Sequence, residues 1–222
     1  MTIADRLIEE RLRRAIERRF PGEVIVGEEF GQPAKPGSSF WTIDPIDGTR
    51  AFSRGLPSWG MLLGHVEDGQ ADFGACAFPV LNTFLGVGRG TPAYERQRGR
   101  RVALHPARPP KTLASTVIFH GGSGWWLTTP YEPGFRRLVK RCFLERAYGD
   151  CYAYLWVFRG NADAMLDYGV KIWDLVPFAA LAAATGRLLS DFSGRPNFRG
   201  PESILAHPAL SRQIVKVLRS HG

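Results

Sequence analysis

The first pattern along the chain is a helical repeat of apolar residues between positions 3 and 19. The apolar positions are Ile3, Leu7, Ile8, Leu12, Ala15 and Ile16. Arg and Glu fill the positions between them, which is typical of an amphipathic helix that packs one face on its own protein. Phe20-Pro21-Gly22 is expected to end this helix.

Short apolar runs predict a series of strands in the rest of the first half. The predicted strands are residues 24–26, 39–43, 60–66, 71–78 and 83–87. Glu67-Asp68-Gly69-Gln70 is a favourable hairpin turn, and a Gly-, Pro- and Ser-rich loop is expected from Gly31 to Ser38. The basic stretch around 89–101 predicts an exposed hairpin.

Helices and strands alternate in the second half. The predicted helices are residues 134–142, 152–158, 173–185 and 208–218, and the predicted strands are 115–119, 164–166 and one that starts at Leu188. Gly121 to Gly124 is a predicted loop. Gly186 is expected to end the helix predicted for residues 173–185. This alternation favours an α/β or α+β fold in layers.

The length of 222 residues fits one domain, residues 1–222, with two lobes at about 1–108 and 109–222. The Pro-rich stretch from His105 to Lys111 is the expected boundary between the lobes. Composition is that of an ordinary globular protein, and no apolar run approaches the length of a membrane helix. The first ten residues lack the apolar segment of a signal peptide, so the expected location is the cytoplasm.

Cysteine usage and charge add little that is specific. Three scattered cysteines predict neither a disulfide framework nor a zinc site, and favour thiols packed as small apolar groups. The net charge of +8 comes from 29 basic residues, of which only five are Lys. This charge could attract a phosphorylated small molecule or nucleic acid, or it could reflect only the use of Arg as the general surface cation. We favour the last, because the Arg clusters at 11–19 and 96–101 carry no interleaved aromatics, and we therefore do not expect nucleic acid as a partner.

Four carboxylates stand at the ends of predicted elements. Glu28 follows one strand, Asp44 and Asp47 follow another, and Asp174 begins a helix. Layered sheets place their sites at such ends, so three separate segments could bring oxygen ligands to one point. Taken singly, each acid is also an ordinary turn or helix-start residue, and spacing alone leaves both interpretations open.

The sequence Asp44-Pro45-Ile46-Asp47-Gly48-Thr49 is informative in its local chemistry. Pro45 disfavours a helical Asp44, so the chain turns directly after the strand, and both acids can face one cation. Gly48 and Thr49 begin a helix whose free N–H groups favour phosphate. Carboxylates, a carbonyl and waters suit Mg²⁺ better than zinc.

This hexapeptide resembles the metal motif of the inositol monophosphatase family of metal-dependent phosphatases. Gly27-Glu28-Glu29 upstream and Trp173-Asp174 downstream, the latter followed by a helix and Gly186, fit the same family pattern. The resemblance covers nearly the whole chain from Thr2 onward. It implies a layered αβαβα sandwich of the inositol monophosphatase and sugar phosphatase type, and hydrolysis of a small phosphorylated metabolite by a homodimer with two or more Mg²⁺ ions.

The resemblance also implies roles for single residues. Glu28, Asp44, Asp47, Asp174 and the carbonyl of Ile46 would be the metal ligands. Glu28, Asp47 and Thr49 would be catalytic, and the N–H groups of Gly48 and Thr49 would hold the phosphate. Asp150, Cys151 and Asp167 would border the substrate.

Within the family, Arg54 to Gly60 and Gly149 to Tyr154 resemble the histidinol-phosphatase branch, which implies histidinol phosphate as the substrate and a place in histidine biosynthesis. Inositol 1-phosphate and a nucleotide 3′-phosphate are the alternatives. A further alternative is a catalytically impaired, shortened member that acts as a binding or assembly protein.

The sequence departs from the family pattern in two places. Family members have a helix and a hairpin before the region that matches Thr2-Ile3-Ala4-Asp5, where this sequence begins. We therefore expect weaker closure of the site, effects on a third metal, and an altered dimer interface. Thr185-Gly186-Arg187 stands where a pair of small residues is usual, and is expected to change the local packing.

Overall fold

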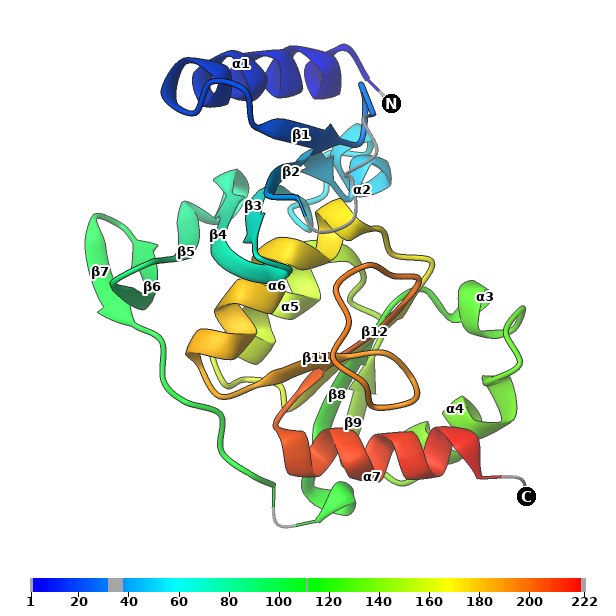
Figure 1. Ribbon diagram of the computed structural model, residues 1–222. Coiled ribbons are helices and arrows are strands. Elements are labelled where there is room, and N and C mark those ends of the chain that lie inside the picture. The colour runs from blue at the N-terminus through cyan, green and yellow to red at the C-terminus, as the bar shows by residue number, and fades with distance from the viewer. Residues whose placement is uncertain (1, 32–37, 111, 221–222) are drawn as a thin grey trace. The chain divides into compact units, whose positions relative to one another are not determined.

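The computed structural model describes residues 2–31, 38–110 and 112–220 (Figure 1). It divides into two compact units. The N-terminal unit comprises Met1–Ala103 and Ile172–Leu181, and the C-terminal unit comprises Leu104–Lys171 and Ala182–Gly222. A segment far along the chain thus returns to the N-terminal unit. The division into lobes at about 1–108 and 109–222 stays a prediction.

The N-terminal unit is built on a seven-stranded sheet in which the strands follow one another in chain order. The strands are β1 (Val24–Gly27), β2 (Phe40–Asp47), β3 (Gly60–Glu67), β4 (Gln70–Phe78), β5 (Thr83–Gly88), β6 (Thr91–Gln97) and β7 (Arg100–Ala103). Only the pair β1 and β2 is parallel. The predicted strands and the hairpin turn at Asp68 and Gly69 are confirmed, with both turn residues at positive φ.

One prediction about this region changes. The strand β2 does not stop before the acidic hexapeptide but runs through it to Asp47. The helix α2 (Thr49–Ser53) follows directly, and a 3₁₀ turn, Pro79–Leu81, joins β4 to β5. Most of the loop predicted from Gly31 to Ser38 lies outside the described residues.

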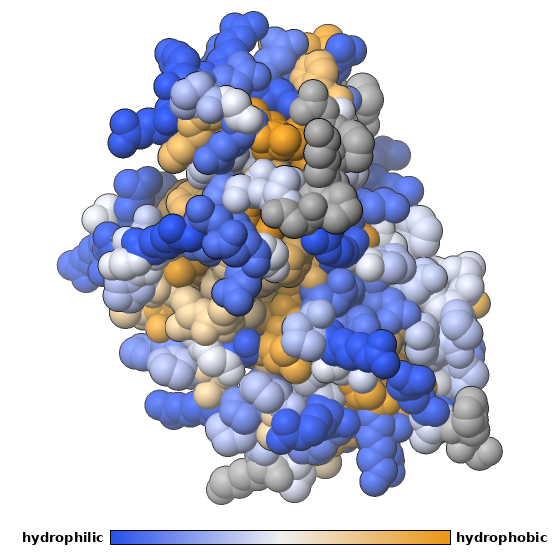
Figure 2. All heavy atoms as spheres, viewed as in Figure 1, coloured by the Kyte–Doolittle hydropathy of each residue, from blue (hydrophilic) through white to orange (hydrophobic). Residues whose placement is uncertain are grey.

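The predicted first helix is confirmed as α1 (Ile3–Arg19), but its predicted apolar face is correct only at some positions, such as Leu12 and Ile16. Ile3 is 80% exposed and Leu7 is 52% exposed, whereas Asp5 and Glu9 are fully buried. Farther along the helix, Ile16 packs with Ile25, Trp41 and Ile43 of the sheet. The helix therefore packs through two acids at its start and through apolar residues at its end. Figure 2 shows mainly hydrophilic residues over its outer surface.

The opposite face of the same sheet is covered by the start of α6 (Ile172–Ala184), at two glycines. Gly64 and Gly74 pair with each other on β3 and β4. A Cβ on Gly64 would lie 2.6 Å from Cγ1 of Val176, and one on Gly74 would lie 2.3 Å from the carbonyl oxygen of Pro177. Glycine is required here because the helix backbone approaches the sheet too closely for any side chain.

The C-terminal unit contains a five-stranded sheet in the order β11-β12-β10-β8-β9. The strands are β8 (Val117–His120), β9 (Leu144–Arg146), β10 (Ala164–Tyr168), β11 (Leu188–Ser190) and β12 (Glu202–Ala206). The helices are α3 (Ser123–Trp126), α4 (Glu132–Val139), α5 (Asp150–Phe158) and α7 (Pro208–Arg219), and Leu113–Ser115 is a 3₁₀ turn. The predicted helices are confirmed to within a few residues. Of the predicted loop at Gly121 to Gly124, the last two residues are helical.

Both faces of this second sheet are buried. Ile118, Leu166 and Ile204 point to one face, where they pack with residues of α4 and α7 such as Phe135 and Ile214. The helix α5 packs on β10 and β12, and its Tyr154 hydroxyl bonds that of Ser203 at 2.6 Å. The strands β8, β10 and β12 are therefore almost continuously buried, as expected when a sheet lies between two helical layers, whereas the edge strand β9 is partly exposed.

Two remaining predictions concern cysteine and the membrane. The side chains of Cys76 and Cys151 are buried and that of Cys142 is partly buried, which confirms their packing as small apolar groups. In the part of the chain that the structure describes, no helix combines the length and hydrophobicity needed to cross a lipid bilayer.

Candidate metal centre

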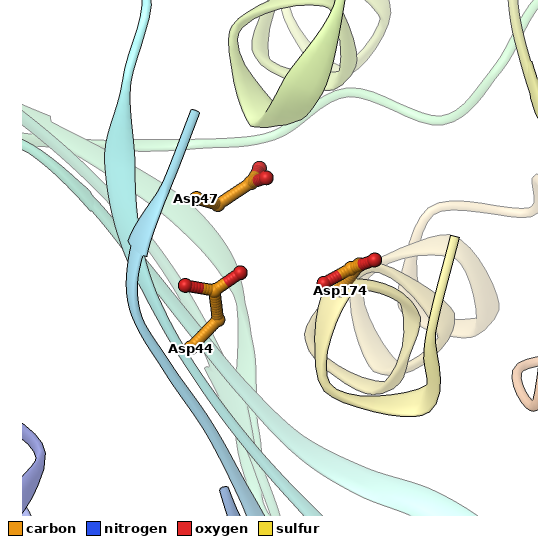
Figure 3. Close-up of side chains that lie close together, drawn as sticks. All are labelled: Asp44, Asp47 and Asp174. Atoms are coloured by element: carbon orange, nitrogen blue, oxygen red, sulfur yellow. The ribbon is translucent and has the colours of Figure 1, made fainter. Parts of the chain in front are cut away.

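Three aspartates of the N-terminal unit gather at one point (Figure 3). Asp44 and Asp47 come from β2, and Asp174 comes from the first turn of α6. Each offers a carboxylate oxygen, and these oxygens lie within 4.8 Å of one another. Three carboxylates around a common point can hold a divalent cation through hard oxygen ligands.

An irregularity in β2 puts two of these acids on the same face of the sheet. In a regular strand, residues three apart point to opposite faces. Here Asp44 pairs with Leu62 and Asp47 pairs with Gly60, so three steps along β2 match only two along β3. This extra residue is a β-bulge, which turns Asp47 to the side of Asp44.

Hydrogen bonds fix the conformation of the bulge. Oδ1 of Asp44 accepts a bond from the N–H of Ile46 at 3.0 Å. The Thr49 hydroxyl donates to the carbonyl of Ile46 at 2.9 Å. A carbonyl oxygen has two lone pairs, so Ile46 can still offer the second one to a cation. Gly48 lies between strand and helix with a φ of 88°, a conformation that favours glycine.

The third aspartate reaches the site because α6 approaches the sheet so closely. Gly64 lies on β3 directly opposite Thr42 of β2, two residues before Asp44. The start of α6 packs on Gly64 and Gly74, and Asp174 is in its first turn. The missing side chains of two glycines thus set the distance between the aspartates of β2 and the aspartate of the helix.

The electrostatics of the cluster are unfavourable without a cation. Asp44 is only 2% exposed. Burial raises its pKa well above the usual range, and the neighbouring charges of Asp47, Asp174 and Glu28 raise the pKa further. The group is therefore a buried acid among like charges, an arrangement that a divalent cation offsets.

Glu28 joins the same cluster from the end of β1. Its N–H donates to the carbonyl of Ile43 at 3.1 Å, which keeps the chain alongside β2. Its carboxyl shares a hydrogen bond with that of Asp44. Burial raises the pKa of Glu28, the bond to Asp44 lowers it, and the charges of Asp5 and Glu9 raise it again. The structure thus brings the four predicted acids together within one unit.

Two acids of α1 near this site were missed by the apolar pattern. Oε2 of Glu9 accepts a bond from the N–H of Glu29 at 2.9 Å, and its Oε1 accepts one from Nε of Arg13 at 2.8 Å. Asp5 has a buried carboxylate oxygen without a hydrogen bond from any described residue. Asp5, Glu9, Leu12 and Ile16 recur at helical spacing, and this spacing was the available signal for the buried face.

The residues expected to border the substrate lie in the C-terminal unit. Asp150 begins α5 and is exposed, whereas Cys151 beside it is fully buried. Asp167, near the end of β10, packs against Gly121, where a Cβ would lie 2.1 Å from its Oδ1. Gly149 also approaches the Cα of Gly121. Asp150 and Asp167 therefore border the same turn of this unit.

Comparison with known sequences gives a consistent result. The profile of the inositol monophosphatase family matches residues 1–222. A histidinol-phosphatase of Mycobacterium tuberculosis is 30% identical over 232 residues, which cover 99% of this chain and 85% of that protein. A histidinol-phosphatase of Chlorobaculum parvum is 30% identical, with 98% and 83% covered. The Nus factor SuhB of Xylella fastidiosa is 28% identical, with 98% and 81% covered.

Solved structures agree with this. An inositol monophosphatase (IMPase) of Thermotoga maritima is 26% identical and superposes with a TM-score of 0.81, covering 98% of this chain and 82% of its own. A staphylococcal inositol monophosphatase is 18% identical with a TM-score of 0.87, covering 100% and 82%, a likeness that shows the fold alone. The predicted fold class, a layered α/β (α+β) fold of the inositol monophosphatase type, is confirmed.

Proposed function

Since the chain belongs to the inositol monophosphatase family of metal-dependent phosphatases, we propose that it hydrolyses histidinol phosphate with the help of Mg²⁺. The observation that carries the chemistry is the cluster of Asp44, Asp47 and Asp174. The choice of substrate rests on the two relatives named histidinol-phosphatase, each 30% identical to this chain.

The donor set suits Mg²⁺. Asp44, Asp47, Asp174 and Glu28 would hold two or more ions, together with the carbonyl of Ile46. All five groups offer oxygen, which hard cations prefer, and none offers nitrogen or sulfur, which zinc prefers. The raised pKa of buried Asp44 supports the same conclusion, because a doubly charged cation is the partner that would keep this acid ionised.

In the proposed reaction, water attacks the phosphorus of a phosphate monoester, the P–O bond to the alcohol breaks, and the products are inorganic phosphate and the alcohol, which takes up a proton of the water. When bound, Mg²⁺ supplies a water of lowered pKa and offsets the charge of the phosphoryl oxygens. The Thr49 hydroxyl and the Glu28 carboxylate position the attacking water, and Asp47 belongs to the same catalytic set. The N–H groups of Gly48 and Thr49, at the start of α2, bind the phosphate.

The proposed substrate residues fit a cationic leaving group. Asp150 and Asp167 border one turn of the C-terminal unit, with Cys151 behind Asp150. Histidinol carries an amine, and two carboxylates would bind this amine by charge-assisted hydrogen bonds. Inositol has no positive charge and would gain nothing from these acids.

Phosphate release from histidinol phosphate tests the metal centre. We expect activity with Mg²⁺ and none with EDTA. Asp47→Asn should lose more than about 100-fold, because a ligand is removed. Asp68→Asn is the matched control, since it makes the same chemical change in an exposed turn of the same unit. Full activity of Asp47→Asn, or loss in Asp68→Asn alone, would refute the assignment of the site.

A substrate panel tests the second part of the proposal. It should contain histidinol phosphate, inositol 1-phosphate and a nucleotide 3′-phosphate. Asp150→Asn and Asp167→Asn should raise the KM for histidinol phosphate and leave the KM for inositol 1-phosphate nearly unchanged. Turnover of inositol 1-phosphate alone would show that the substrate is wrong and the metal chemistry right. No turnover of any monoester would favour the binding or assembly protein. The homodimer and the cytoplasmic location stay predictions.

A further inference from the structure

A cavity of about 250 Å³ lies within the C-terminal unit. Its wall is formed by residues 105–108, the end of α5, the residues before β10, Arg187, and His207 at the start of α7. Its volume is below the range of about 300–1,000 Å³ that is typical of pockets for drug-sized ligands. The cavity therefore suits a small molecule or ion.

This cavity is separate from the residues proposed to bind the substrate. Asp150 begins α5 whereas Phe158, which lines the cavity, ends it. A helix of nine residues is about 13 Å long. In the same way, Asp163 of the cavity precedes β10, and Asp167 lies near the far end of that strand. The cavity also contains none of the metal-centre acids, so it is a second site.

Cationic side chains dominate the wall of the cavity. Arg108, Arg159 and Arg187 contribute three positive charges and Asp163 one negative charge, so the lining carries +2 with neutral histidines. The Asp163 carboxylate already accepts a hydrogen bond from the backbone N–H of Val117 at 2.7 Å. A concave site with this excess of positive charge attracts anions.

The side chain of Arg187 is held in one position by neighbouring groups. Its guanidinium donates to the carbonyl of Val157 at 2.9 Å and to that of His105 at 3.2 Å, and lies 5.4 Å from the ring centre of Phe158. Burial lowers the pKa of Arg187 from its usual value. Both carbonyls are neutral, so the partly buried cation lacks an anionic partner among these bonds, and an anion in the cavity would supply one.

Arg159 and His207 are also held by neighbouring groups. The Arg159 guanidinium lies 4.8 Å from the ring centre of Trp156. Nδ1 of His207 accepts a bond from the backbone N–H of Ala209 at 3.1 Å, so Nε2 carries the proton even in the neutral ring. His207 also caps α7, a helix of twelve residues whose N-terminal end favours negative charge.

We propose that this cavity binds a small molecule through a phosphate group, at a site distinct from the metal centre. Three Arg residues and a histidine that line one small space match the multiple oxygens and the double charge of phosphate better than a single carboxylate. An Arg-rich composition alone would scatter these residues over the surface. Here three of them converge with a histidine donor on one cavity, and one is fixed by backbone carbonyls. The source is either inorganic phosphate or a phosphorylated metabolite.

The test is calorimetric titration in EDTA, with Asp47→Asn in all proteins so that the metal centre does not bind phosphate. Inorganic phosphate, glycerol 3-phosphate and acetate are the three ligands. Arg108→Gln with Arg159→Gln is the test variant, because it leaves Arg187 and the two carbonyls that accept its hydrogen bonds unchanged. Arg98→Gln with Arg101→Gln is the control. It removes the same charge from an exposed hairpin, and Arg101 also stacks on a ring, that of Tyr94.

We expect saturable phosphate binding that weakens at least about tenfold in the test variant and less than about twofold in the control. Tighter binding of glycerol 3-phosphate than of inorganic phosphate identifies a metabolite as the source, and equal binding identifies the free ion. Absence of saturable phosphate binding, equal binding of acetate, or an equal loss in both variants overturns the proposal. If the double variant does not fold, Arg108→Gln alone is measured against Arg98→Gln by the same criteria.

Discussion

Asp44→Asn should stabilise the metal-free protein while it abolishes the response to Mg²⁺. The side chain of Asp44 is buried, which raises its pKa well above the usual value, and the neighbouring charges of Asp47, Asp174 and Glu28 raise the pKa further. The amide of Asn has the same shape without the charge. Its oxygen can still accept the bond from the N–H of Ile46, so the bulge keeps its conformation.

The size of the effect follows from the geometry of the cluster. Two unit charges 4.8 Å apart repel by about 3.5 kcal/mol at an effective dielectric constant of 20. Asp44 has two such neighbours, Asp47 and Asp174, but both are partly exposed, and solvent screens part of the repulsion. We therefore expect the free energy of unfolding in EDTA to rise by about 2–4 kcal/mol in Asp44→Asn. This is large against the roughly 5–15 kcal/mol of a whole domain.

The stability gained by Asp44→Asn should depend on pH. A carboxyl group whose pKa is raised in the folded state binds more protons when folded than when unfolded. Its contribution to stability is therefore complete below the usual pKa near 3.8 and is lost as the pH rises through the raised value. The stability difference between Asp44→Asn and the parent should grow from small at about pH 4 to its full size near pH 7. Other groups, such as Asp191, are common to both proteins and cancel in the difference.

Urea unfolding followed by circular dichroism, in EDTA and in Mg²⁺, is the measurement. The parent should gain stability with Mg²⁺ and Asp44→Asn should not. Asp68→Asn, in the exposed turn of the same unit, should behave like the parent in both conditions. If Asp44→Asn is as stable as the parent or less stable in EDTA at pH 7, with the fold retained, then the like charges do not strain the site and our electrostatic reasoning fails.

Three further changes test neighbouring features. Gly74→Ala places a Cβ against the backbone of α6, so Mg²⁺ affinity by calorimetry should fall at least about tenfold, while Gly124→Ala, in open space, should have no effect. Thr49→Val should lower kcat about 100-fold with little change in KM, and Thr49→Ser should recover most of the rate; equal rates for both variants would exclude a role of the hydroxyl. Glu9→Ala leaves Arg13 without its buried partner and should cost about 3–5 kcal/mol in urea unfolding, whereas a loss below about 1 kcal/mol would show that the pair is not a structural anchor.

Local patterns were sufficient for most single elements of the fold. The helix from Ile3 to Arg19 and the hairpin at Asp68 and Gly69 follow from spacing and turn chemistry that lie within a few residues. The strand β12, Glu202–Ala206, was missed, and it is short and apolar like many buried segments of other kinds. β9, Leu144–Arg146, was missed too, because three residues carry almost no period.

The candidate site was predictable in composition but not in geometry. The acids of the hexapeptide and Asp174 could be named from motifs, and the resemblance to a family connected them. The bulge in β2 could not be predicted, because it depends on the pairing of Asp47 with Gly60 on another strand. The buried face of α1 was misassigned for a related reason: Glu9 is buried by its bonds to Arg13 and to the backbone of Glu29, and a count of apolar residues does not register such bonds.

The acids of the cluster are gathered by the backbone and not by their own interactions. A bulge turns Asp47 toward Asp44, and the close approach of α6 at Gly74 brings in Asp174, so repulsion among the three is imposed by the fold. Two variants should therefore change the stability of the metal-free protein in opposite directions. Asp44→Asn relieves the repulsion and should raise stability in EDTA, whereas Gly74→Ala disturbs the packing that imposes it and should lower stability. Asp44→Asn should lose the response to Mg²⁺, and Gly74→Ala should show a weaker response. An incidental group of acids would give no such pattern, because neither change would then alter cation binding.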